Sequence, residues 1–148
     1  MSLALAFGII AMLGLTAFIR LAPVNLPDWH QPLPAASPAS LDCPATVQTA
    51  RGSASAACLF ADAPPALLAR LNTAALATPR TTLVAGSPAE GLMTWETRSA
   101  IWGFPDYTTA QATATPQGTR LDLSARLRFG GYDFGVNAAW LTDWLARL

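Results

Sequence analysis

The sequence predicts an α+β protein with an N-terminal transmembrane helix, a Pro-rich stalk and a mostly antiparallel sheet of about four strands with helices on one face. Three observations carry this prediction. An uncharged apolar run comes first, two stretches of period-two alternation meet at a turn, and two amphipathic segments lie before and after them. We therefore expect an anchor at residues 1–22, a linker at 23–41 and a single α+β domain at 42–148.

The apolar run extends from Leu3 to Ile19 without a charged residue. A helix over about residues 2–22 would be roughly 30 Å long, which matches the hydrocarbon core of a bilayer. A cleaved signal peptide and a buried soluble helix are the alternatives, but the run lacks a basic n-region and a small-x-small cleavage site. Ala4, Gly8 and Ala11 form a small-residue stripe, a candidate helix–helix face that can also arise by chance.

The linker contains five prolines that favour an extended, semi-rigid backbone: Pro23, Pro27, Pro32, Pro34 and Pro38. Trp29 lies early in the linker, either at the lipid headgroups or packed on the domain. The single histidine, His30, follows it, so no histidine is well placed as a general base.

Two cysteines, Cys43 and Cys58, either form a disulfide or stay as thiols. With one histidine in the linker they make a poor zinc shell, so we expect no metal and no cofactor. Arg20 after the apolar run favours a cytoplasmic domain, whereas the cysteine pair and the Pro-rich linker favour the periplasm. We expect a single-pass bacterial inner-membrane protein with a periplasmic domain.

The composition argues against nucleic acid as a partner. Nine arginines and no lysine balance nine acidic residues, so no basic surplus is present to bind phosphate backbones. Charged residues make up only 12%, which indicates a surface of small residues or one covered by a partner.

Two segments show helical periodicity. Asp62 is the expected N-cap of the first, which ends at Pro79. Its apolar face consists of Leu67, Leu68, Leu71, Ala74 and Ala75. The second is expected to begin at Asn137 as N-cap, with Val136 and Leu141 as a hydrophobic staple. Its apolar face consists of Leu141, Trp144, Leu145 and Leu148.

Strands are expected at residues 81–85, 92–99, 107–115 and 119–129. The last alternates most clearly, with leucines, Ala125 and Phe129 on one side and charged residues on the other. Pro116 and Gly118 signal a turn that joins the last two strands into a hairpin.

A connection between strands, residues 98–107, carries large apolar side chains. Exposed, Ile101, Trp102 and Phe104 would form a docking patch for lipid or protein. The alternative is that they fold back and cap the core. With Trp140 and Trp144 of the last helix, they make up the candidate docking residues.

A glycine-rich segment, residues 126–137, joins the last strand to the last helix. Arg126 or Arg128 can pair with Asp133 in a salt bridge that fixes the turn. The alternative is an anion-binding corner of arginines and free N–H groups at the helix start. The candidate residues of this polar corner are Arg98, Asp106, Arg126, Arg128, Asp133 and Asn137.

These two segments resemble the bacterial family called domain of unknown function 1499, over about residues 63–148. The matching positions are Arg98, Ser99, Gly103, Phe104, Pro105, Asp106, Arg126, Arg128, Gly130, Asp133, Gly135, Val136 and Asn137. Leu127 departs from the usual serine, and residues 138–140 depart from the usual basic helix. The resemblance implies a frequent N-terminal membrane segment or export signal, and no activity.

No catalytic motif is present in the sequence. We expect a non-enzymatic, membrane-anchored accessory subunit that docks on an integral-membrane protein complex, with a respiratory or photosynthetic assembly as the guess. The alternative is a membrane-tethered binding module for a small anionic ligand or lipid headgroup. A hydrolase using Ser99 or Ser124 with Asp106 or Asp133 is the least favoured reading, because no base is visible.

Overall fold

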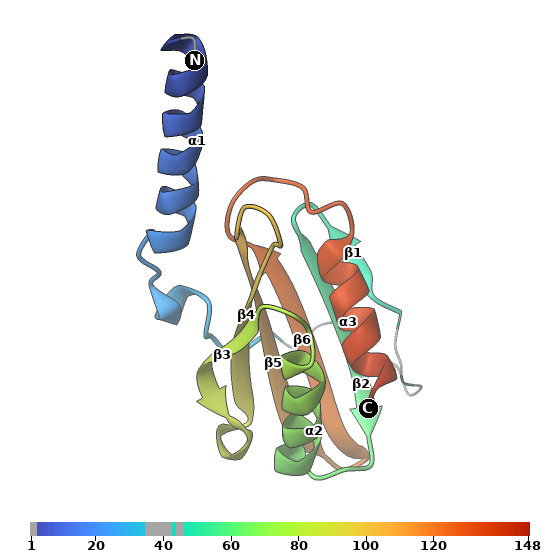
Figure 1. Ribbon diagram of the computed structural model, residues 1–148. Helices are drawn as coiled ribbons and strands as arrows, with labels where there is room; N and C mark the ends of the chain where they lie inside the picture. The colour runs from blue at the N-terminus through green and yellow to red at the C-terminus, as the bar shows by residue number, and fades with distance from the viewer. Residues whose placement is uncertain (1–2, 35–42, 44–45) are drawn as a thin grey trace.

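The computed structural model describes residues 3–34, 43 and 46–148, and it is an α+β fold with one antiparallel sheet (Figure 1). The helices are α1 (Leu3–Leu21), α2 (Pro64–Leu76) and α3 (Val136–Ala146), with short 3-10 turns η1 (Leu26–Asp28) and η2 (Pro88–Glu90). The strands are β1 (Gln48–Ala50), β2 (Ser53–Phe60), β3 (Thr81–Ser87), β4 (Leu92–Arg98), β5 (Pro105–Thr115) and β6 (Gly118–Leu127). The predicted fold class is confirmed.

The sheet has six strands in the order β1-β2-β6-β5-β4-β3, not the four expected. All neighbours are antiparallel, and the predicted hairpin is β5 with β6, closed by Thr115 opposite Gly118. The strands missed were β1 and β2. In β2, small residues alternate, with Ala54, Ala56 and Cys58 buried, and small side chains give a weak strand signal.

One face of the sheet is covered by α2 and α3, as predicted (Figure 1). The expected apolar face of α2 is buried, and Leu141, Trp144 and Leu145 are buried on α3. Trp95 of β4 joins the helices, because its ring lies edge-on to Trp144 at 5.7 Å and its indole N–H donates to Asn72. This layer is the core of the domain.

The opposite face of the sheet is covered by the linker, which corrects its expected role as a spacer. Residues 22–34 leave α1 and pass behind the sheet (Figure 1). Three successive side chains of β5 that face away from the helices contact this segment. The Tyr107 ring lies 4.4 Å from the Trp29 ring, Thr109 donates to the Trp29 carbonyl, and Gln111 accepts from the Leu33 amide. Of the two positions considered for Trp29, the structure has it on the domain. Residues 35–41 lie outside the described part of the chain.

Both predicted N-caps are wrong by one or two residues. The helix α2 is capped by Ala63 with Pro64 in its first turn, and Asp62 instead accepts from Arg70. The helix α3 is capped by Gly135, whose φ of +82° is accessible to glycine without strain. Asn137 therefore lies within the first turn and is buried.

Cys43 and Cys58 form a disulfide, which ties the segment before β1 to the buried face of β2. A cross-link over this sequence separation restricts the unfolded chain and contributes about 3 kcal/mol.

We predict that Cys43→Ala lowers the free energy of unfolding by about 3 kcal/mol, because the unfolded chain regains its freedom. The measurement is the thermal midpoint in detergent with and without dithiothreitol. The reductant should lower the midpoint of the wild type and leave that of the variant unchanged. A wild type insensitive to reduction would contradict the prediction.

Candidate functional site

The end of the domain nearest α1 is built from four connections: residues 51–52, 77–80, 99–104 and 128–135. We call it the loop end. The last turn of α1 meets it, since Ile19 is buried and the Phe18 ring lies 6.2 Å from the Phe129 ring. Arg20 lies against Gly103, where an added Cβ would come within 3.1 Å of the Arg20 Nε. The helix that could cross a membrane therefore leaves the domain at this end.

Large apolar side chains are exposed at the loop end. Ile101 is 78% exposed, Tyr132 68% and Phe134 87%, and Trp102 is also exposed. Phe104 is half-buried because its ring packs 6.2 Å from that of Phe129. The connection after β4 thus folds back only in part.

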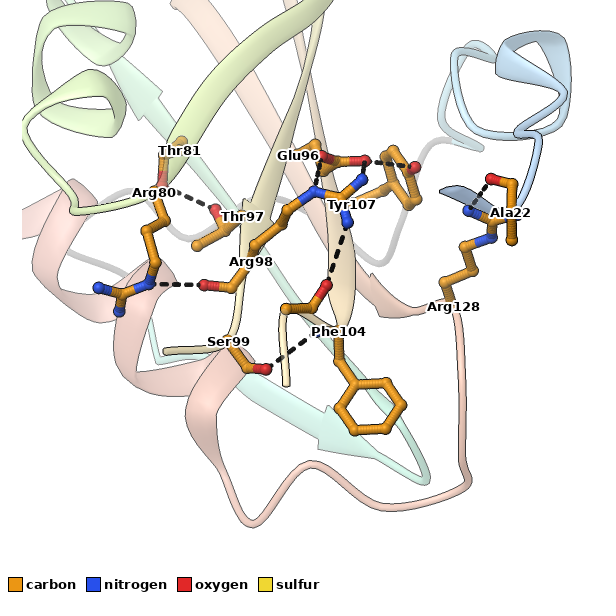
Figure 2. A network of polar contacts seen from close by, with 11 residues as sticks. Ala22, Arg80, Thr81, Glu96, Thr97, Arg98, Ser99, Phe104, Tyr107 and Arg128 are labelled. Carbon is orange, nitrogen blue, oxygen red and sulfur yellow. Dashed lines mark hydrogen bonds and ion pairs between the residues drawn. The ribbon is translucent and has the colours of Figure 1, made fainter. Parts of the chain in front are cut away.

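That connection is a loop closed at its base by hydrogen bonds. The Ser99 amide donates to the Phe104 carbonyl, and the Phe104 amide donates to the Ser99 hydroxyl. Arg98 donates to the Gly103 carbonyl at 3.1 Å (Figure 2). The two ends of the loop that carries Ile101 and Trp102 are therefore bonded to each other.

A charged network supports this loop from the sheet (Figure 2). Arg98 donates to both carboxylate oxygens of Glu96, at 2.6 and 3.1 Å, and the Tyr107 hydroxyl donates to the same carboxylate at 2.7 Å. Burial and the hydrogen bond to Glu96 raise the pKa of Tyr107 to about 12. Because Arg98 is paired with the Glu96 carboxylate, its positive charge is already compensated.

Arg126 and Arg128 bind the linker, which corrects both readings proposed for them. Arg126 donates to the Trp29 carbonyl at 2.9 Å and its guanidinium lies 5.0 Å from the Trp29 ring. Arg128 donates to the carbonyls of Ala22 and Pro23. Burial lowers the pKa of Arg126. These two arginines attach α1 to the domain instead of pairing with Asp133 or lining an anion corner.

The other residues of the predicted polar corner, Asp106, Asp133 and Asn137, form hydrogen bonds at the start of α3. Burial tends to raise the pKa of Asp133, but hydrogen bonds from the amides of Asn137 and Gly135 hold it below its usual value. Asn137 donates through its side chain to Asp106 at 3.3 Å. Burial raises the pKa of Asp106 to about 7, against the hydrogen bond from Asn137, and the nearby Asp133 adds to the rise. Asp106 faces the helices, on the side of β5 opposite Tyr107.

The tryptophans of α3 are not a docking surface. Trp144 is 0% exposed, packs on Trp95 and donates its indole N–H to Thr78. Trp140 is half-buried against the core. The two tryptophans are four residues apart because they lie on the side of α3 that packs on the core. Of the candidate docking residues, Ile101, Trp102 and Phe104 remain, all at the loop end.

Two cavities open at the loop end. One of about 750 Å³ lies between β1, β2 and the start of α3, lined by Arg51, Ser53, Tyr132 and Asp133 among others. The other, of about 260 Å³, lies beside the end of α1, lined by Arg20, Arg80, Glu96 and Arg98 among others. The sequence interpretation did not select Arg20, Arg51, Arg80, Tyr132 or Phe134. A glycine-rich segment with aromatic residues could have pointed to the last two.

Ala4, Gly8 and Ala11 are exposed along α1, and their role as a helix–helix face stays a prediction. The helix has the length and composition of a membrane span, as signal sequences also do.

Within the described residues no group of three His, Cys, Asp or Glu side chains could hold a metal. The Nδ1 atom of His30 forms a hydrogen bond with the Thr94 hydroxyl, at 2.9 Å.

The features above define a small α+β domain with a helix of membrane-spanning length at its N-terminal side. The model of a family of proteins of unknown function, DUF1499, matches residues 33–148, and the chain belongs to this family. The match begins earlier than the resemblance seen in the sequence and includes β1, β2 and both cysteines.

Among solved structures, the chain is similar to the crystal structure of protein MLL2253 from Mesorhizobium loti. The two share 13% identity over 64% of this chain and 92% of that chain, with a TM-score of 0.46. No curated protein matches the chain.

We predict that Asp106→Asn changes how stability depends on pH. The folded chain keeps the Asp106 proton up to about pH 7, whereas the unfolded chain loses it near 3.8. The free energy of unfolding therefore falls as pH rises between these values, by at most about 1.4 kcal/mol per pH unit. Asp106→Asn removes this fall, which urea unfolding at pH 4.5 and 7.5 would detect. The exposed Asp143→Asn is the control, and equal slopes for wild type and Asp106→Asn would refute the prediction.

We also predict that Trp29→Ala loosens the linker, because it removes the ring that covers Tyr107 and contacts Arg126. Loss of a half-buried indole costs about 2 kcal/mol locally, so thermolysin should cut within residues 22–34 roughly tenfold faster or more. Trp102→Ala, which removes an exposed indole, should leave the rate unchanged. Equal rates for all three proteins would show that the linker is not held by Trp29.

Proposed function

We propose that this protein is a non-enzymatic accessory protein, anchored in the bacterial inner membrane by α1, whose loop end docks on an integral-membrane protein complex. The anchoring is supported by the length and apolar exposed surface of α1. The bonds from Arg126 and Arg128 to the linker support a domain held in one orientation to that helix.

The observation that carries this proposal is the position of the exposed apolar side chains. Ile101, Tyr132 and Phe134 are exposed at the end from which α1 leaves the domain. If α1 crosses a bilayer, these side chains lie at its surface, within reach of neighbouring membrane proteins. Exposed aromatic and aliphatic residues are typical of the centres of protein interfaces.

The larger cavity favours a protein over lipid as the occupant of this surface. It combines the exposed ring of Tyr132 with the charged side chains of Arg51 and Asp133. Acyl chains offer such charged groups no partner, whereas a polypeptide loop supplies both apolar and hydrogen-bonding groups. Its volume of about 750 Å³ is sufficient for a few side chains.

The disulfide supports the periplasm as the side on which the domain lies, because disulfides form in oxidising compartments. We therefore extend the proposal to a periplasmic domain attached to a single membrane helix.

The test is photo-crosslinking in native membranes, with a benzophenone amino acid in place of Ile101 or Phe134. We expect crosslinks to one integral-membrane protein, identified by mass spectrometry, which would also show whether the complex is respiratory or photosynthetic. The control position is Gln117, exposed in the turn at the opposite end of the sheet, where no such product should form. Crosslinks to lipid alone, or equal products from Gln117, would overturn the proposal.

A further inference from the structure

The smaller cavity beside α1 collects positive charge in a chain whose formal net charge is zero. It lies between the last turn of α1, the start of β3 and the end of β4. Arg20, Arg80 and Arg98 line it, with Glu96, Thr82 and Ser99. The lining thus contains three guanidinium groups and one carboxylate.

The carboxylate is already satisfied. Glu96 accepts two hydrogen bonds from Arg98 and one from Tyr107, so its charge is compensated within the sheet. Arg98 also donates from its other terminal nitrogen to the Gly103 carbonyl. The charges of Arg20 and Arg80 are therefore in excess in this cavity.

Arg80 is held in place by its backbone and by one side-chain nitrogen. Its Nε donates to the Arg98 carbonyl at 3.0 Å, and its two terminal nitrogens are directed away from that bond (Figure 2). Its φ of +61° is the left-handed conformation, which is uncommon for a residue with a side chain. Because the Nε is fixed, the terminal nitrogens are prearranged donors without a partner among the residues that the structure describes.

Arg20 contributes the second guanidinium with unpaired donors. Its side chain is exposed in the last turn of α1 and has no ion-pair or hydrogen-bond partner within the described chain. A basic residue directly after an apolar span lies at the depth of lipid phosphates when that span crosses a bilayer. The cavity therefore opens where phosphate groups are concentrated.

We propose that this cavity binds a phosphate group, with Arg20 and Arg80 as its ligands and the Arg98–Glu96 pair as its fixed wall. Guanidinium groups bind phosphate oxygens through paired hydrogen bonds. A volume of about 260 Å³ suits a small headgroup rather than an extended ligand. The phosphate comes from an anionic lipid or from a soluble phosphate. The lipid source rests on the membrane anchoring in the proposed function, but neither source depends on docking to a protein partner.

The first experiment uses the full chain in nanodiscs of phosphatidylcholine with phosphatidylglycerol, released in native mass spectrometry. The wild type should retain phosphatidylglycerol over phosphatidylcholine, and Arg20→Gln or Arg80→Gln should each reduce this retention about tenfold, the loss of a charge-assisted hydrogen bond. Arg51→Gln is the matched control, because Arg51 is at the same loop end but lines the other cavity. Thermal midpoints of the variants check that each is folded.

The second experiment titrates inorganic phosphate and pyrophosphate into the detergent-purified chain by calorimetry. Binding that depends on Arg20 and Arg80 assigns a soluble phosphate, whereas retention of phosphatidylglycerol without such binding assigns a lipid. If neither arm depends on these arginines, or if Arg51→Gln loses as much lipid, the proposal is overturned. The crosslinks from Ile101 and Phe134 do not require this cavity, so failure of either proposal can be recognised separately.

Discussion

The contact on which the rest of the structure depends is the seating of Trp29 on Tyr107. The indole contacts both this buried tyrosine and its cross-strand neighbour Arg126, and the Trp29 carbonyl accepts from Arg126 and from Thr109. Without it, the polar face of the sheet would lie open to water. With it, a segment of the chain becomes a third layer, opposite the helices.

This seating also determines how the domain is placed relative to α1. Arg128 binds the first carbonyls after the helix, and Ile19 of the helix itself is buried. An extended spacer would let the domain adopt many orientations, whereas these contacts favour the one seen in the structure. One orientation brings the exposed residues of the loop end and the arginine cavity to the side where α1 leaves.

Much of the domain could be predicted because local periodicity reports directly on burial. The alternation in β6 gave the strand, and the spacing of Leu67, Leu71 and Ala75 gave the buried face of α2. Alternation of small residues in β2 gave too weak a signal. The polar corner was misassigned because Arg126 and Arg128 lie near Asp133 in the sequence, whereas their partners are residues 22, 23 and 29.

The sequence by itself determined the elements: an apolar helix of membrane-spanning length, a hairpin at Pro116 to Gly118, two amphipathic helices and a family. Only the tertiary structure decided which residues are available for function. It buried Trp144, left Ile101 and Phe134 exposed, and used Arg126 for attachment. Arg20 and the terminal nitrogens of Arg80 line a cavity and have no side-chain partner among the described residues. The physical reason is that periodicity separates the two faces of an element, whereas what covers each face depends on segments far away in the chain.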